Sequence, residues 1–273
     1  MNGLAMALSS EVTANAQNLL QAMRFFGSPR KRGEICDLPG VSLVSCGLNY
    51  AAFNAAILSE PLGLASKPLT ERIRVAADFF RSRNLRWTYW LCDDYVKAGI
   101  RFGLRTDAQK LFSKFGMSPL TEPVGMFADR LLPPQHRLPE LEIRRVEDEP
   151  TRRAFAHITS VAFEIPLKIC LDVYGSGDAW LGDFHGFVGY ADQLPVTTTA
   201  TVVAANVVGV YSVGTLPLYR KRGYAEAIVR QALARDKEHT GIDASILQAT
   251  QSGLRLYQQM GYRKVTKFSV FIS

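Results

Sequence analysis

The segment VYSVGTLPLYRKRGYAEAIV, residues 210–229, carries the strongest structural signal in the sequence. Its β-branched first part favours a strand, and its last part favours an amphipathic helix from about Tyr224 to His239, stopped by Gly241. Apolar side chains recur on one face of that helix, at Ala225, Ile228, Val229, Ala232 and Leu233. The RKRG turn therefore stands at the N-terminus of a helix that packs on a sheet.

A turn in this position favours an anion. The first backbone N–H groups of a helix have no intrahelical partner, and the aligned peptide dipoles add about half a positive charge. Gly223 lets a ligand approach the backbone, and the small Ala225 does not crowd it. Full charges come from Arg220, Lys221 and Arg222. The turn is neither a GxxxxGK[ST] loop nor a GxGxxG loop, but R-x-x-G-x-A at a helix start still predicts a phosphate or pyrophosphate site.

The strand, turn and helix together resemble the acyl-CoA-binding motif of the GNAT superfamily of N-acetyltransferases, which has a Q/R-x-x-G-x-G/A turn. LQATQSGLRLYQQMGYRKV, residues 247–265, is similar to the next motif of that family, a strand and then a helix carrying L-Y-x-x-x-G-[FY]. The two motifs cover about residues 208–265, and a weaker pattern extends the match back to about Leu141. The resemblance implies a mixed α/β, GNAT-like fold in the C-terminal half. It also implies transfer of an acetyl group from acetyl-CoA to a primary amine.

The resemblance implies roles for single residues. The pyrophosphate of acetyl-CoA would lie on the RKRG turn, and the pantetheine arm would pair with the preceding strand, much as an added strand does. Tyr257 matches the family tyrosine, whose phenol would donate a proton to the departing thiolate. The other interpretation of Tyr257 is an aromatic side chain packed in the core. The expected cofactor-binding residues are Val213, Gly214, Thr215, Arg220, Lys221, Arg222, Gly223, Tyr224, Ala225 and Thr250.

The chain departs from the family pattern at Thr250, where many members carry an asparagine that contacts the pantetheine. No general base stands out, although an amine with a pKa of about 8 to 10 is mostly protonated at neutral pH. A water chain to bulk solvent is one alternative, and the carboxylates and the histidine that border the expected central strands are another: Glu164, Asp183, His185 and Asp192. Because no serine or cysteine stands out as a covalent carrier, we expect direct transfer in a ternary complex.

RKRG also occurs at residues 30–33, in a different context. The acidic Glu34 and Asp37 follow it, and no helix pattern does, so this copy is expected to be a solvated loop. Farther along, LFSKFGM (residues 111–117) echoes LYQQMGY (residues 256–262), with Phe112 at the place of Tyr257. The echo suggests either a degenerate GNAT-like N-terminal half or a chance likeness between generic helix–glycine–strand units.

Composition and punctuation indicate a globular chain of two domains. The 273 residues are 47% hydrophobic and 21% charged. The proline-rich RLLPPQHRLPE, residues 130–140, predicts a linker, and therefore an N-terminal domain over 1–135 and an acetyltransferase domain over 136–273. The four cysteines and four histidines are scattered, so neither a disulfide framework nor a metal site is expected.

Nothing in the sequence predicts a membrane segment. The N-terminus lacks the features of a signal peptide, and the uncharged residues 194–219 are rich in threonine, which favours strands. A cytoplasmic protein is therefore expected. The acceptor would be a small-molecule or peptide amine, which the sequence does not identify because loops carry specificity.

Two other functions stay open. One is a non-catalytic acyl-CoA-binding sensor or partner-binding module on the same fold. The other is a nucleic-acid binder that uses both RKRG loops, and the mild, dispersed net charge of +7 argues against it.

Overall fold

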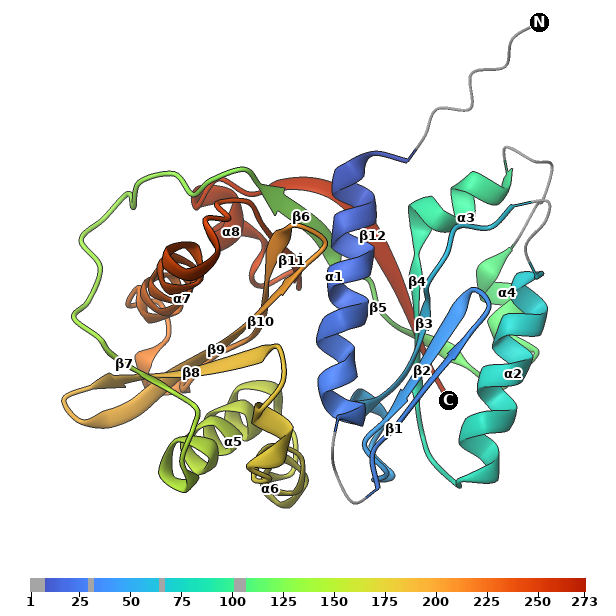
Figure 1. Cartoon of the computed structure of the whole chain (residues 1–273), viewed down its shortest axis with the longest axis horizontal. Helices are drawn as coiled ribbons and strands as arrows, with labels where there is room; N and C mark the ends of the chain where they lie inside the picture. The colour runs from blue at the N-terminus through green and yellow to red at the C-terminus, as the bar shows by residue number, and fades with distance from the viewer. Residues whose placement is uncertain (1–7, 29–31, 64–66, 101–106) are drawn as a thin grey trace, which may run out of the picture.

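The threonine-rich, uncharged segment after Gln193 forms two antiparallel strands, as the sequence predicts. This computed structural model describes residues 8–28, 32–63, 67–100 and 107–273. β9 (Leu194–Ala204) and β10 (Val207–Thr215) are joined by a two-residue turn at Ala205 and Asn206, whose φ angles are 52° and 59°. Both positive angles suit the tight hairpin turn that matches strand twist. β8 (Phe184–Ala191) and β7 (Glu142–Arg145) continue this sheet to one edge (Figure 1).

Helices cover both faces of the C-terminal part of the sheet. α5 (Glu149–Phe163) begins in a capping box between Asp148 and Thr151 and is followed by α6 (Leu167–Tyr174), which the sequence did not predict. α7 (Tyr224–Thr240), β11 (Ser245–Ala249) and α8 (Leu254–Gln259) occupy the positions predicted for them. Figure 1 shows α5 and α6 below these strands and α7 and α8 above them.

The N-terminal half repeats the same strand–helix–strand unit. β3 (Asn54–Leu58), α2 (Leu69–Ser82) and β4 (Thr88–Cys92) follow one another as β10, α7 and β11 do, and in both units the two strands are parallel. The remaining N-terminal elements are β1 (Glu34–Leu38), β2 (Val41–Ser45), α3 (Asp93–Ile100), α4 (Ala108–Ser113), β5 (Ser118–Thr121) and β6 (Val124–Ala128). β1 to β3 were not predicted from the sequence.

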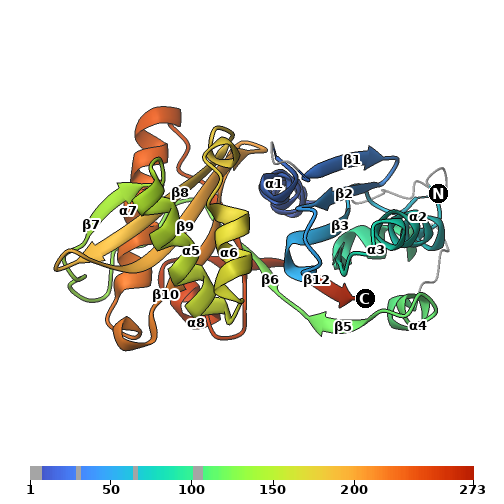
Figure 2. The same ribbon diagram turned by 90° about the horizontal axis from the view of Figure 1, so that it is seen from below.

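The two halves exchange strands and so share one sheet. β6, from the N-terminal half, pairs with β11, while the last strand, β12 (Arg263–Ile272), pairs with β4 and β5. The described strands follow the order β1-β2-β3-β4-β12-β6-β11-β10-β9-β8-β7. Figure 2 shows β6 and β12 crossing between the two lobes. The boundary proposed at residue 135 falls in the strand-free and helix-free stretch 129–141, but β12 pairs with β4, β5 and β6, and β6 pairs with β11, so the hydrogen-bonded sheet joins the two sides of that boundary.

Helix α1 (Ser10–Gly27) lies between the two halves, as Figures 1 and 2 show. Its apolar face is buried, and so are two asparagines, Asn15 and Asn18. Asn18 donates to the carbonyls of Val202, Ala204 and Val207, and its Oδ1 accepts the Tyr211 hydroxyl at 2.6 Å. A helix from the first half of the chain thus supplies hydrogen bonds to the strands of the second half.

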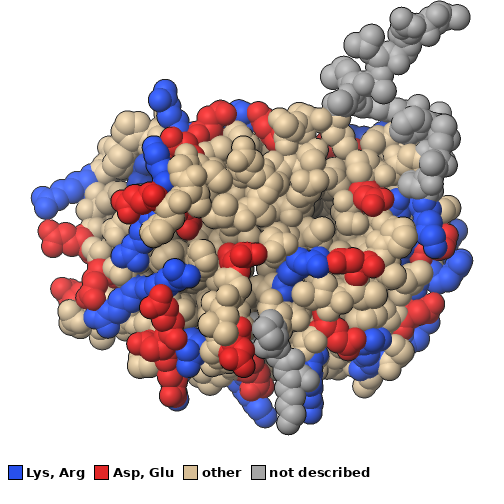
Figure 3. Space-filling view, viewed as in Figure 1, with Lys and Arg blue, Asp and Glu red and all other residues tan. Residues whose placement is uncertain are grey.

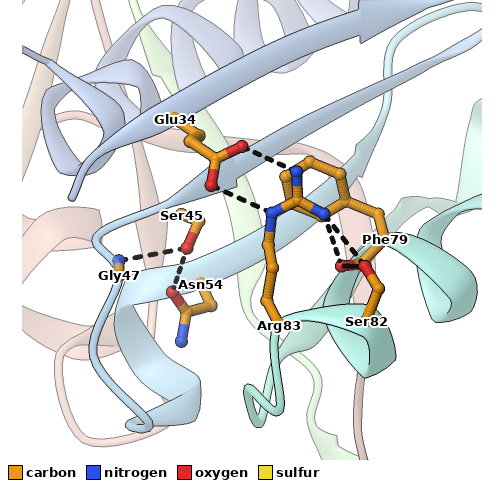
Figure 4. Close-up of polar contacts among 7 residues, drawn as sticks. All are labelled: Glu34, Ser45, Gly47, Asn54, Phe79, Ser82 and Arg83. Carbon is orange, nitrogen blue, oxygen red and sulfur yellow. Dashed lines mark hydrogen bonds and ion pairs between the residues drawn. The ribbon is translucent and has the colours of Figure 1, made fainter.

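The segment after the first RKRG forms β1 rather than part of a loop. Arg30 and Lys31 lie outside the described residues. Glu34 accepts two hydrogen bonds from Arg83, at 2.9 and 2.8 Å, and Asp37 pairs with Arg24 of α1 at 2.7 Å. Figure 4 shows Arg83 reaching from the end of α2 to Glu34. These acidic side chains therefore fasten β1 to neighbouring helices, although exposed pairs of this kind stabilise a fold only slightly.

A buried amide shapes the loop between β2 and β3. Asn54, which is fully buried, donates to the carbonyls of Leu48 and Tyr50 and to that of Arg86. Its Oδ1 accepts the Ser45 hydroxyl at 2.9 Å, as Figure 4 shows. Because one side chain satisfies several buried backbone groups, it holds the loop in one conformation.

Candidate functional site

A β-bulge interrupts β10 at the centre of the candidate site. The pairing of β10 with β9 shifts register between Tyr211 and Gly214, and Ser212 has a φ of 50°. A non-glycine residue in this region is uncommon and needs support from its surroundings. The support comes from three fully buried threonines of β9, whose hydroxyls donate to bulge carbonyls: Thr199 to Tyr211, Thr198 to Ser212 and Thr197 to Gly214.

Beyond its first residues, β10 separates from β11. The two strands pair only at Val208 with Ser245 and at Gly209 with Ile246. The rest of β10 therefore has an edge that β11 does not occupy, and this edge includes the predicted pantetheine contacts Val213, Gly214 and Thr215. Such an edge can accept main-chain hydrogen bonds from an extended ligand.

The RKRG turn follows this edge and ends at a helix N-terminus, as predicted. Lys221 and Gly223 have φ angles of 60° and 85°, and Gly223 is the N-cap of α7 without a side-chain capping bond. Only glycine adopts such an angle at little cost, which explains its place here. The first N–H groups of α7, from Tyr224 and Ala225 onward, therefore face outward without a side-chain cap.

The three cations of the turn have different surroundings. Arg220 donates from Nε to the Thr215 carbonyl at 3.0 Å and from Nη2 to the Ala162 carbonyl at 3.5 Å, so it closes the turn against β10 and α5. Lys221 and Arg222 are exposed, and the Arg222 guanidinium lies 5.9 Å from the centre of the Tyr219 ring. Two of the three charges are thus available to an anion.

Tyr257 lies on α8 and is only 8% exposed. It packs in the same apolar cluster as Val210 of β10 and Ile228 of α7, so the packing interpretation is compatible with its position. Within the described part of the chain its hydroxyl has no hydrogen-bond partner, and burial raises the pKa of Tyr257 well above the usual range. The phenol therefore keeps its proton at neutral pH.

Thr250 is exposed just before α8. Its hydroxyl lies 3.0 Å from that of Ser252, and its carbonyl accepts the N–H groups of Gly253 and Leu254. The carbonyl therefore takes part in the turn that begins the helix, and the hydroxyl is engaged locally.

A cavity of about 620 Å³ lies between the two halves beside the bulge. The C-terminal half contributes Tyr211 and Ser212 of β10 and the end of α5, and the N-terminal half contributes one side of α1 and residues 49–53. The volume is typical of small-molecule sites. The residues that line this cavity could not be identified from the sequence, because its walls come from segments up to about 250 residues apart.

The four candidates for a general base are not brought together. Asp183 accepts a hydrogen bond from the side chain of Gln21, and Asp192 lies in the β8–β9 turn. Nδ1 of His185 lies 3.8 Å from a carboxylate oxygen of Asp236, a buried residue of α7. None of the four lines the cavity beside the bulge. Glu164, the C-cap of α5, is the one flanked on both sides in the chain by residues that do.

The N-terminal half lacks the features of this site. β3 pairs with β2 without a register shift and stays paired with β4 over three residues. The fully buried Arg72 of α2 donates to the carbonyls of Lys67, Gly40 and Glu60, so a guanidinium fills the space beside that helix start. Phe112 stacks on Phe271 with ring centres 3.9 Å apart.

Residues 183–265 match the family model described as an acetyltransferase (GNAT) domain. The match lies in the C-terminal half, where the sequence predicted a GNAT acetyltransferase domain. No curated protein sequence matches the chain.

Solved structures match both halves. A GCN5-related N-acetyltransferase from Kribbella flavida is 16% identical, with a TM-score of 0.69 over 98% of this chain and 96% of that one. A GCN5-related N-acetyltransferase from Sphaerobacter thermophilus is 18% identical, with a TM-score of 0.52 over 87% and 82%. A functionally unknown protein from Staphylococcus epidermidis is 12% identical, with a TM-score of 0.59 over 90% and 95%. The mixed α/β architecture of the whole chain is therefore shared with GNAT proteins.

Other kinds of site find little support in the described residues. They contain no group of three or more His, Cys, Asp or Glu side chains placed to hold a metal. None of the described helices has the length and apolar character to cross a bilayer. On the face shown in Figure 3, basic and acidic side chains are interspersed. This face has no continuous basic patch of the kind that nucleic-acid binding needs.

Proposed function

We propose that the protein is an N-acetyltransferase that moves an acetyl group from acetyl-CoA directly to a primary amine. One observation carries the proposal. The bulged strand β10 borders the interlobe cavity at Ser212 and contacts the RKRG turn at Thr215, through Arg220. A cofactor held by its pyrophosphate on α7 and by its pantetheine along β10 would present its thioester where the cavity opens.

The amine nitrogen would attack the thioester carbonyl, the C–S bond would break, and the sulfur would take the bonding electron pair. Tyr257, which stays protonated, would give that sulfur a proton, while the nitrogen loses one to solvent or to Glu164. A covalent cysteine intermediate is disfavoured, because burial raises the pKa of Cys92 and raises that of Cys170 to about 11.

A non-catalytic acyl-CoA-binding module is the second candidate. Two observations favour it: Tyr257 packs in an apolar cluster, and the lining residues within the described ranges include no carboxylate or histidine.

One assay separates the two. Free thiol release from acetyl-CoA is followed with amino acids, polyamines, aminoglycosides, arylalkyl amines and peptides, and the acetylated product is identified by mass spectrometry. We expect amine-dependent release of CoA and an N-acetyl product with at least one class. Tight CoA binding without amine-dependent release would instead support the binding module.

A further inference from the structure

The interlobe cavity has an unusual lining for a site that receives an amine. It is built largely of aromatic and aliphatic side chains, among them Phe26, Trp90 and Phe163, and the described residues that line it include no aspartate or glutamate. The charged side chain that lines it is a cation, Arg86. A ligand with several positive charges would meet apolar walls and a like charge, and burial of unpaired charge is costly.

Two residues with hydroxyl side chains line this apolar cavity, and one of them belongs to the bulge. Thr159 of α5 is 2% exposed, and among the described residues its hydroxyl has no hydrogen-bond partner. Ser212, the bulge residue, lines the cavity as well. An unpartnered buried hydroxyl is costly unless a ligand or water satisfies it. Because Thr159 and Ser212 both line the cavity, we place the polar group of the ligand beside these two residues.

We infer that the acceptor is a monoamine whose single amino group is carried on an aromatic or branched aliphatic body. The inference rests on the proposed function and names the substrate class of that site. The body fills the cavity between α1 and residues 49–53, and the amine lies beside Thr159 and Ser212. Polyamines and aminoglycosides are excluded, because Arg86 repels a second positive charge and the lining, as far as the chain is described, offers no carboxylate to offset it.

The apolar cavity has one competing occupant, the acyl chain of a long-chain acyl-CoA. The acceptor would then be small and would lie elsewhere. The position of Arg86 on the wall from the N-terminal half favours the acceptor, since an acyl chain lying against this exposed cation would strip its water, and its hydrogen bond to the Ser273 carbonyl is a long one at 3.5 Å.

The test compares benzylamine with p-xylylenediamine, which adds a second amine to the same ring, and with spermidine. With acetyl-CoA as donor, we expect kcat/KM for benzylamine to exceed both others by about 10-fold or more, the scale of burying one apolar group. Arg86→Glu should raise the ratio of diamine to benzylamine by about 10-fold, because it replaces repulsion by attraction. A preference for spermidine, or no change of that ratio in Arg86→Glu, would overturn the inference.

A second variant tests where the body of the acceptor lies. Ala52 is an exposed residue of the lining, so Ala52→Trp should narrow the cavity without disturbing the core, and Ala52→Ser is the matched control. We expect Ala52→Trp to lower kcat/KM for benzylamine by about 10-fold or more, with Kd for CoA unchanged. An unchanged kcat/KM would contradict the placement.

The donor and the parent activity supply the remaining controls. If the parent protein turns over octanoyl-CoA faster than acetyl-CoA, and Ala52→Trp removes that advantage, the cavity holds the acyl chain. This result would overturn the inference and leave the proposed function standing. Acetylation of spermidine but not benzylamine would leave the proposed function standing and reject the substrate class. If the parent protein acetylates none of the amines while binding CoA, the proposed function fails, and the inference fails with it.

Discussion

Gly223→Asp is expected to abolish the binding of acetyl-CoA. The new carboxylate would stand at the start of α7, where the pyrophosphate is proposed to lie. At a separation of about 4 Å and an effective dielectric constant of about 20, two like charges repel by about 4 kcal/mol, or roughly a 1000-fold loss of affinity. Titration calorimetry with CoA measures this loss.

Gly223→Ala is the control for backbone strain, because it adds a Cβ at the same backbone conformation without the carboxylate. In this variant residue 223 keeps its φ of 85°. Its new Cβ would lie 3.0 Å from Cδ of Pro139 in the linker. The left-handed conformation alone costs about 1–2 kcal/mol, so a moderate loss is expected for this variant. If the two variants bind CoA equally well, the pyrophosphate does not lie on this turn.

Tyr257→Phe is expected to lower kcat by about 100-fold to 10,000-fold, the usual contribution of a general acid. The ring and its packing stay, and the hydroxyl has no hydrogen-bond partner to lose in the described chain, so folding stability and the KM for acetyl-CoA should change little. Steady-state kinetics and a thermal melt measure the two effects separately.

Tyr262→Phe provides the contrast. Its hydroxyl lies 2.8 Å from that of Ser245, and its ring meets that of Tyr257 edge to face at 5.8 Å. Losing that hydrogen bond should reduce stability by about 1 kcal/mol and leave kcat nearly unchanged. A Tyr257→Phe enzyme within twofold of the parent would reduce Tyr257 to a packing residue.

The parts of the site that could be predicted are local in sequence. The apolar period of the sequence predicts helix α7, the RKRG turn predicts its start, and Gly241 predicts its end. Gly241 is the C-cap and has a φ of 74°. The β-branched residues and the Ala205-Asn206 turn predict the hairpin between β9 and β10. Each of these features is set by residues within about one turn of one another, so a single sequence contains the information.

The parts that could not be predicted depend on distant partners. In the sequence, Thr197–Thr199 indicates only a preference for a β-strand. The structure shows the bulge of β10 opposite these residues, and their hydroxyls donate to its carbonyls. β2 and β3 are buried five-residue strands, too short for a period to be diagnostic. The exchange of β6 and β12 between the halves leaves no trace in composition, because each strand would look the same beside either partner.

The central claim is that each chain has one acetyl-CoA site, formed by the C-terminal half. β3 and β4 stay paired where β10 and β11 separate, Arg72 fills the space at the start of α2, and Phe112 has no proton to give. The most direct test is isothermal titration of the full chain with CoA, beside the Gly223→Asp variant. We expect a stoichiometry near one for the parent and no measurable binding for the variant. A stoichiometry of two, or one site that survives Gly223→Asp, would show that CoA binds elsewhere and would contradict the claim.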